Sequence, residues 1–182
     1  MPTKSVAETV AVVDETVVPE TAHAYVQTES EELLIERAGY AIAAEALRMM
    51  GGGYGRRVTI IAGKGNNGND GRAAARYLRR RGIRCNIQAP DSPTLPKSNL
   101  VIDAAFGTGF RDSWRPPSQP QCRVLAVDIP SGIDGLTGHD TGSLQADTTV
   151  TFGALKPGLL LQPGASRSGK IKIVDLGLDI GT

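Results

Sequence analysis

The sequence predicts an α/β protein with a mostly parallel sheet, helices on both faces of that sheet and shortened crossover connections. Two observations support this fold class. Apolar stretches of about five residues show no polar alternation, which is typical of strands buried on both faces. Helical segments and clusters of glycine and proline separate these stretches. The 182 residues, of which 40% are hydrophobic, suit one domain with a substantial core.

Composition and charge argue against several kinds of partner. The chain has 20 basic and 19 acidic residues, and only 4% of its residues are aromatic, so neither a nucleic-acid surface nor a base-stacking platform is expected. The sequence contains no apolar run of membrane-spanning length and no signal-peptide core. Cys85 and Cys122 lie alone in apolar stretches and are expected to be buried and reduced. We therefore expect a cytoplasmic protein without a nucleic-acid or membrane partner.

The chain divides into a weakly patterned segment, 1–28, and a single domain, 29–182. The valines of the first segment are spaced three or four apart, which allows a short amphipathic helix. Ser30 is a good N-cap, and the two glutamates that follow it suit the first turn of a helix. An apolar face continues from there until Gly51, the first of three glycines. We expect a helix between Ser30 and Gly51.

The remaining elements follow from short strand-like segments, of which 58–62 and 123–128 are expected to be buried, and from one periodic segment. Strands are expected at 58–62, 84–88, 100–103, 123–128, 148–152 and 170–174. A helix is expected at 70–81, with its arginines mostly forming a solvated surface. Segments 89–99 and 107–121 are rich in proline and polar residues, so two crossovers lack full helices.

The strongest local motif is GKGNNG at 63–68, which reads G-x-G-x-x-G between a predicted strand and a predicted helix. Glycines at these positions permit a tight turn and bring backbone amides close to the phosphates of a dinucleotide. The motif therefore predicts a Rossmann-like fold. A usual dinucleotide site also has an acidic residue at the end of the second strand, but Gln88 and Ala89 stand there. Ordinary hydride transfer is therefore less favoured than the motif alone suggests.

Polar residues also follow the other predicted strands. Asp103 ends the third strand, Asp128 ends the fourth, and Ser131 follows closely. Because parallel strands end at one edge of the sheet, these oxygens are expected to face one crevice, where they suit a hard cation or a sugar hydroxyl. Each aspartate alone could equally stabilise a turn. Lys156 is interpreted as a structural or solvated lysine rather than a phosphate ligand, and His139 as solvated.

Several long motifs carry a resemblance to a known family. They are LIERAG at 34–39, AGKGNNGNDG at 62–71, VIDAAFGTGF at 101–110, VDIPSGID at 127–134 and TVTFGALKPGLLL at 149–161. Together they resemble the NAD(P)H-hydrate epimerase family, whose domain stands N-terminal to the NAD(P)H-hydrate dehydratase in bifunctional relatives. The resemblance covers roughly residues 30–178. It implies a Rossmann-like fold, in agreement with the analysis of the residues.

The resemblance also implies an isomerase of metabolite repair. Such enzymes interconvert the R and S forms of NADHX and NADPHX, the hydrates at C6 of the reduced nicotinamide ring, and a partner dehydratase consumes one epimer. The implied partners are these small molecules and, as a functional partner, the NAD(P)H-hydrate dehydratase. A second copy of the chain, in a homodimer, is a further candidate. The implied cofactor is a potassium ion.

Residue roles follow from the same resemblance. The implied substrate-binding residues are Asn66, Asn67, Gly68, Asn69, Asp70, Gly107, Thr108, Gly109, Phe110, Arg111, Asp112, Ser113 and Asp128. The implied potassium ligands are Asn67, Asp103 and Ser131. Two departures stand out. Asn69 occupies a position where the family usually has glycine, and the segments 89–99 and 112–121 are shorter than in the family.

The chemistry of C6 suggests the catalytic groups. Loss of the C6 hydroxyl as water gives a flat iminium, and water can return to either face. A carboxyl group near C6 would serve as acid and base and would stabilise the cation. Asp103 and Asp128 are both candidates, which the sequence does not rank. As residues at strand ends facing a crevice, both are expected to matter more to turnover than to stability.

Two alternatives remain at this stage. A small NAD(P)-dependent reductase would need a substrate domain or a catalytic Tyr–Lys or His, for which the sequence offers no candidate. A non-catalytic dinucleotide-binding or scaffold module of the same fold would have lost polar site residues, whereas Asn67, Asp70, Asp103, Asp128 and Ser131 are all retained.

Overall fold

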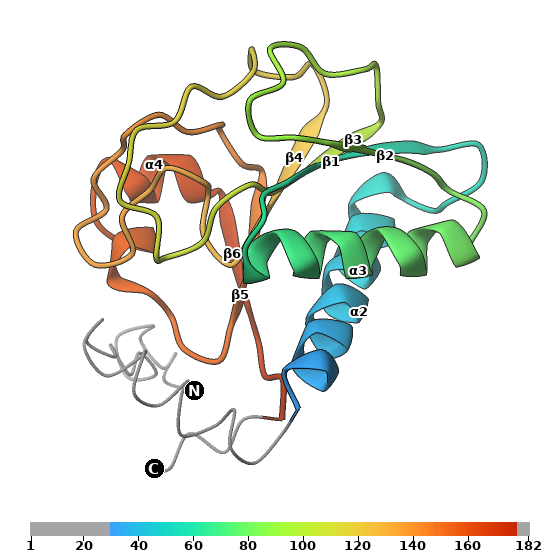
Figure 1. The fold of residues 1–182 in the computed structure, drawn as a ribbon, viewed down its shortest axis with the longest axis horizontal. Helices are drawn as coiled ribbons and strands as arrows, with labels where there is room; N and C mark the ends of the chain where they lie inside the picture. Colours follow the sequence, from blue (N-terminus) through green and yellow to red (C-terminus); the bar gives the residue numbers. More distant parts are fainter. Residues whose placement is uncertain (1–29, 178–182) are drawn as a thin grey trace, which may run out of the picture.

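Six parallel strands form a sheet in the order β2-β1-β3-β4-β5-β6 at the centre of the protein (Figure 1). This computed structural model describes residues 30–177. The strands are β1 (Arg57–Ala62), β2 (Arg84–Gln88), β3 (Leu100–Ala104), β4 (Arg123–Val127), β5 (Thr148–Phe152) and β6 (Lys170–Val174). The predicted Rossmann-like α/β fold is confirmed, and each strand lies within one residue of its expected bounds. The expectations for 1–28, including its helix, lie outside the described residues.

The helices are α2 (Glu31–Met50), α3 (Asn66–Arg80), the short 3₁₀ helix η2 (Pro157–Leu159) and α4 (Gly164–Ser168). The α2 helix begins and ends as its sequence predicts. Ser30 Oγ accepts a hydrogen bond from the backbone N–H of Leu33 at 3.3 Å, and Gly51 closes the helix with a φ of 67°. In the part of the chain that the structure describes, no helix is long and apolar enough to cross a membrane.

The α3 helix begins at Asn66, four residues before the start that we predicted at Asp70. The asparagines of the glycine-rich turn therefore form its first turn, although Gly65 at the N-cap offers no side chain to bond them. Asn69 is helical and has no positive φ, so the departure from glycine at this position costs no backbone strain. Helix propensity does not predict that α3 starts at Asn66, because glycine and asparagine are poor helix formers.

Hydrophobic side chains fill both sides of the sheet. On one side α2 and α3 pack through Ile42 and Leu78 onto the strands. On the other side Trp114 and Leu144 pack from loops. Thr149 Oγ1 of β5 also donates to the carbonyl of Ser168 at the end of α4, at 2.7 Å. Helices thus lie on both faces, but the second face carries only short ones, because the crossovers 89–99 and 105–122 contain no helix.

A buried carboxylate ties the edge strand to the helical layer. Glu45 of α2 is 1% exposed and forms ion pairs with Arg48 and with Lys172 of β6, whose Nζ lies at 3.1 Å. The bond from Arg48 is the main cause that holds the pKa of Glu45 below its usual value, against the opposing effect of burial. This ion-pair cluster joins α2 to β6, the strand at the opposite edge of the sheet from β2.

The strand order creates the switch point at which open α/β sheets bind ligands. From β1 the chain passes to β2 on one side, whereas β3 lies on the other side of β1 and leads on to β4. In this register Ile61 of β1 pairs with Asp103 of β3, which in turn pairs with Ala126 of β4. The carboxyl ends of β1, β3 and β4 therefore meet where the predicted site residues lie.

Candidate active site

The three glycines of the 63–68 turn have different structural roles. A Cβ on Gly63 would lie 1.9 Å from the carbonyl oxygen of Ala105, and one on Gly68 would lie 1.9 Å from that of Gly63. These two positions require glycine for the close packing of the turn itself. Gly65 has nothing within 4 Å of its Cβ position and precedes the first turn of α3. It therefore leaves open space before a helix N-terminus, where a phosphate can approach.

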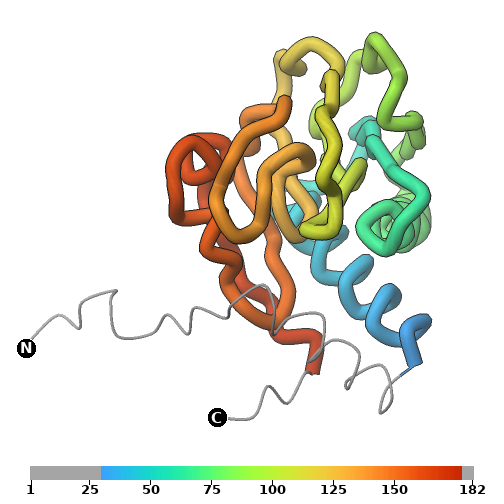
Figure 2. The backbone as a smooth tube through the Cα atoms, turned by 60° about the vertical axis from the view of Figure 1, so that its left-hand side comes forward, coloured from blue at the N-terminus to red at the C-terminus, as the bar shows by residue number. Residues whose placement is uncertain are grey.

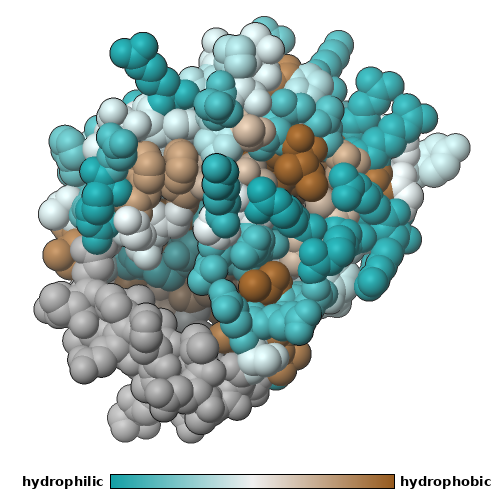
Figure 3. Space-filling view, in the orientation of Figure 1, coloured by the Kyte–Doolittle hydropathy of each residue, from teal (hydrophilic) through white to brown (hydrophobic). Residues whose placement is uncertain are grey.

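Arg72 braces this turn from within α3. Its Nη1 donates to the carbonyl of Gly63 at 2.7 Å, and its Nη2 reaches the carbonyl of Ala62 at 3.4 Å. We expected the arginines of this helix to be mostly solvated, and hydrophilic side chains do gather over α3 (Figure 3). Arg72 departs from that expectation because its guanidinium serves carbonyl groups of the turn.

Asp103 is enclosed at the end of β3. It is 0% exposed and accepts hydrogen bonds from the backbone N–H and the hydroxyl of Ser131, at 2.9 and 2.6 Å, and from the N–H of Ala105 at 3.3 Å. Burial raises the pKa of Asp103 above its usual value, and the bonds from Ser131 and Ala105 oppose this effect. The expectation of a carboxylate outside the core is therefore wrong for Asp103, because the loop that carries Ser131 closes over it.

Asn67 joins the same group of residues through Phe106. Its Nδ2 donates to the carbonyl of Phe106 at 2.8 Å, and the hydroxyl of Ser131 lies 3.1 Å from the same oxygen. Asn67 Oδ1 is buried and has no hydrogen-bond partner among residues 30–177. The structure thus brings Asn67, Asp103 and Ser131 together, with one buried oxygen left unsatisfied. Such an orphaned acceptor beside a carboxylate and a hydroxyl fits a hard cation.

Asp128 follows β4 in a strained conformation. Its φ of 64° makes it the only non-glycine residue of the described chain with a positive φ. The N–H of Asp128 donates to the carbonyl of Val150 on β5 at 2.6 Å, which holds the strained residue against the sheet. The side chain pairs with Lys156, whose Nζ lies 2.5 Å from Oδ1. Lys156 is 11% exposed, so of the two interpretations, a structural or a solvated lysine, the structure supports the structural one.

Asp70 lies one helical turn beyond Asn67 and is only partly exposed. Among the residues that the structure describes, no donor contacts its carboxyl group. Burial, and secondly the negative charge of Asp128, raise the pKa of Asp70 to about 8. Asp70 and Asp128 therefore differ in environment although they are close enough to interact.

The predicted binding loop 107–113 is held by aromatic side chains. Phe106 stacks on Phe110 with ring centroids 4.0 Å apart, and its ring meets that of Trp114 edge to face at 5.7 Å. Trp114 in turn donates through Nε1 to the carbonyl of Pro90 at 2.9 Å. Figure 2 shows the yellow segment after β3 beside the orange loop after β4, and Thr141 Oγ1 joins them by donating to the carbonyl of Asp112 at 3.1 Å.

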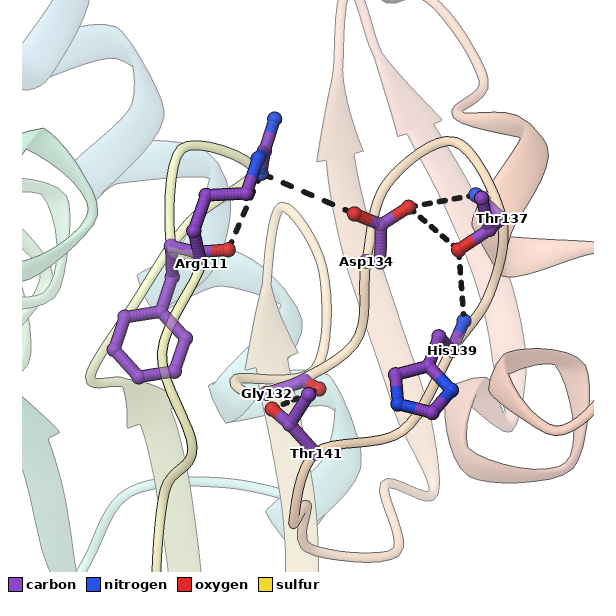
Figure 4. Close-up of a pocket in the computed structure, with 7 residues that line it drawn as sticks. Arg111, Gly132, Asp134, Thr137, His139 and Thr141 are labelled. Carbon is purple, nitrogen blue, oxygen red and sulfur yellow. Dashed lines mark hydrogen bonds and ion pairs between the residues drawn. The ribbon is translucent and has the colours of Figure 1, made fainter.

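A pocket of about 290 Å³ lies between these two loops (Figure 4). It is lined by Phe110, Arg111, Gly132, Asp134, Thr137, His139 and Thr141. Of these, only Phe110 and Arg111 belong to the predicted site. The pocket wall thus carries a cationic and an anionic side chain, with Arg111 and Asp134 4.0 Å apart. The carboxylates Asp70, Asp103 and Asp128 do not line this pocket.

The structure thus divides the predicted residues into three groups. Asn67, Asp103 and Ser131 share hydrogen bonds, Asp70 interacts with Asp128, and the loop 107–113 borders the pocket. The sequence patterns did not indicate the contacts that Lys156 and Arg72 make. Lys156 could have been found, because it follows β5 at the same sheet edge as the predicted aspartates. Arg72 carried no such signal, because it is one of five arginines within ten residues.

These features define an α/β domain with an open glycine-rich turn before a helix N-terminus, beside buried side-chain oxygens and carboxylates. The family described as YjeF-related protein N-terminus matches residues 31–97 and 84–158. The NAD(P)H-hydrate epimerase of Leuconostoc mesenteroides is 34% identical in an alignment that covers 81% of each chain. The chain therefore belongs to this family, which includes NAD(P)H-hydrate epimerases.

Two further comparisons place the domain. The bifunctional NAD(P)H-hydrate repair enzyme Nnr of Hyperthermus butylicus is 32% identical over 79% of the chain, which spans only 34% of that enzyme. The solved structure of yeast ynu0 (YNL200c) superposes with a TM-score of 0.73 over 91% of this chain and 88% of the yeast chain. At 22% identity that structure supports the fold alone.

Proposed function

We propose that this protein is an NAD(P)H-hydrate epimerase that interconverts the R and S forms of NADHX and NADPHX at C6. One observation carries the proposal: the chain matches a stand-alone epimerase over 81% of both sequences. The geometry supports it, because the turn at 63–68 opens onto the sheet edge at which Asp70, Asp103 and Asp128 are gathered.

The binding part of the mechanism follows from two features. The open turn before α3 receives the phosphates of the dinucleotide on backbone N–H groups, with Gly65 allowing close approach. The loop 107–113, held by Phe106 and Trp114, lies over the neighbouring strand end and offers Arg111 to the substrate. These contacts hold the hydrated ring toward the carboxylates.

The chemical part needs an acid and a base near C6. Asp128 is better placed than Asp103 to exchange a proton with the substrate. Asp128 is 19% exposed, whereas Asp103 is enclosed by its own hydrogen-bond donors. When the hydroxyl leaves as water, the iminium that forms carries a positive charge, and a carboxylate beside it lowers the energy of that state.

The potassium site is part of the proposal. Asn67 Oδ1, Asp103 and the hydroxyl of Ser131 would hold the ion, which supplies positive charge where an anionic substrate binds. Potassium should then raise the melting temperature above that in an equal concentration of a bulky organic cation. In Asn67→Ala this difference should disappear, and an unchanged difference would remove Asn67 from the site.

A coupled assay tests the function. A mixture of the two NADHX epimers is given to a dehydratase that consumes only one of them, with and without this protein. We expect the protein to make the second epimer disappear as well, at a rate proportional to its concentration. If the second epimer remains at its spontaneous rate, the scaffold alternative replaces the epimerase. NADH oxidation in the presence of carbonyl compounds would instead support the reductase.

A further inference from the structure

The ammonium group of Lys156 uses all three of its N–H donors in hydrogen bonds beside Asp128. Nζ donates to Asp128 Oδ1 at 2.5 Å, to Thr151 Oγ1 at 2.9 Å and to the carbonyl of Phe152 at 2.9 Å. An ammonium has three protons, so this lysine has no donor left for a phosphate. Its charge is directed at Asp128 alone, because the other two oxygens are neutral.

The two carboxylate oxygens of Asp128 differ in their hydrogen-bond partners. Oδ1 accepts from Lys156, from Thr151 Oγ1 at 3.2 Å and from the N–H of Phe152 at 3.3 Å. Oδ2 receives no hydrogen bond from any residue between 30 and 177, and the side chain is 19% exposed. One oxygen is therefore anchored to β5 and its following turn, and the other is left for a ligand. The φ of 64° is the backbone cost of this orientation.

Asp70 has the opposite environment. No donor among the described residues stabilises its negative charge, and Asp128 opposes it. Burial and Asp128 raise the pKa of Asp70 to about 8, so Asp70 carries a proton at neutral pH. Other charged groups nearby are engaged or exposed: Asp103 is enclosed by its donors, Arg72 holds the Gly63 carbonyl, and Lys64 is exposed.

We propose that Lys156 is a positioning residue that anchors Asp128 through Oδ1 and thereby divides the chemistry between two carboxyl groups. Asp128 acts as the base through Oδ2, and Asp70 acts as the acid. Pairs of carboxyl groups in different environments commonly divide acid and base roles in this way. The inference rests on the proposed epimerase function and deepens it, because it assigns each proton transfer to one residue.

The steps balance without a further reactant. Asp70 gives its proton to the C6 hydroxyl, the C6–O bond breaks with its electron pair on oxygen, and water leaves. The lone pair of the ring nitrogen forms the C=N bond of the iminium. Water then adds to the opposite face of C6, the iminium electrons return to nitrogen, and Asp128 takes the released proton. Transfer of that proton from Asp128 to Asp70 restores the starting state.

The test compares epimerisation by Lys156→Met, Lys156→Arg and Asp70→Asn, followed directly by NMR of the two epimers between pH 5 and 10 after subtraction of the spontaneous rate. Lys172→Met is the matched control, because it removes a lysine from an ion pair on β6. In Lys156→Met we expect kcat to fall about 10²-fold with KM changed less than about threefold.

Two further results are required. Lys156→Arg should recover most of the lost kcat, and Asp70→Asn should lose the basic limb that we expect near pH 8 in the wild type. The proposal is overturned if Lys156→Met keeps the wild-type kcat, if its loss of kcat is no larger than that of Lys172→Met, or if Asp70→Asn retains the basic limb. If Lys156→Met fails to fold, the kcat of Lys156→Arg and the pH profile of Asp70→Asn test the proposal. A wild type without epimerisation overturns the function itself, which is a separate outcome.

Discussion

Two carboxylates at neighbouring strand ends, Asp103 after β3 and Asp128 after β4, look alike in the sequence but have opposite surroundings. Asp103 is wholly buried, and both of its oxygens accept hydrogen bonds. Asp128 is partly exposed and receives all of its donors on one oxygen. The first arrangement fixes a loop in place, and the second leaves Asp128 Oδ2 without a hydrogen bond from the described residues. Equal positions in the topology therefore do not imply equal surroundings.

The difference comes from the residues that follow each strand. After Asp128 the chain turns through a proline to Ser131, and that serine returns to Asp103 with both its N–H and its hydroxyl. The loop of β4 thus completes the shell of the β3 carboxylate. After β5, Lys156 completes the shell of the β4 carboxylate on one side only. Each strand end is therefore closed by the loop of its neighbour.

The largest expected effect is on turnover in Asp128→Asn. If Asp128 is the base, the variant should lose about 10²–10⁴-fold in kcat. Its stability should change by less than about 1 kcal/mol, since asparagine tolerates a positive φ and still accepts from Lys156. Rate measurements on the two epimers, paired with denaturant unfolding, check both parts. Full activity would return the base role to Asp103 and reverse the comparison.

Asp103 and Asp128 also show which features of the site can be predicted from the sequence. All six strands are predicted from local sequence, and the G-x-G-x-x-G motif locates the turn before α3. Apolar runs give the clearest signal for the buried strands β1, β3 and β4, whereas the edge strands β2 and β6 are largely exposed. The burial of Asp103 is not predictable in this way, because it depends on Ser131, 28 residues later in the chain. The pair of Asp128 with Lys156 likewise joins residues that are far apart in sequence and adjacent only in the sheet.

The second prediction concerns stability in Asp103→Asn. An amide has one acceptor oxygen where the carboxylate accepts three bonds, so a buried donor loses its partner at a cost of about 1–3 kcal/mol. Urea unfolding of this variant beside Asp91→Asn, an exposed aspartate, makes the comparison. We expect a lower midpoint for Asp103→Asn only. Equal midpoints would show that the shell of Asp103 contributes nothing to the fold.

A smaller effect is expected for the pH dependence of stability in Asp70→Asn. The pKa of Asp70 rises from 3.8 to about 8 on folding, so between these values the folded protein binds the additional proton. Stability of the wild type should therefore fall as pH rises through this window. The variant lacks this loss and should be more stable by on the order of 1 kcal/mol above pH 8, with the difference vanishing near pH 4. A difference independent of pH would place Asp70 in an ordinary solvated environment.

The smallest effect on the fold is expected at Gly65, and it tests whether the open turn belongs to the site. Gly65 has a φ of −85° and a ψ of −171°, which alanine adopts without strain, and its Cβ would enter open space. Gly65→Ala should therefore change stability by less than about 0.5 kcal/mol. Gly68→Ala is the contrast, because its Cβ would lie 1.9 Å from a backbone oxygen. This variant should be destabilised by about 1–3 kcal/mol.

The kinetic effect of Gly65→Ala tests whether the substrate phosphates approach this residue. If they do, the variant should raise KM several-fold while kcat stays within about twofold, since the methyl group occupies space that the ligand needs and leaves the carboxylates untouched. Steady-state kinetics on both epimers would measure this split, and an unchanged KM would place the phosphates away from the turn.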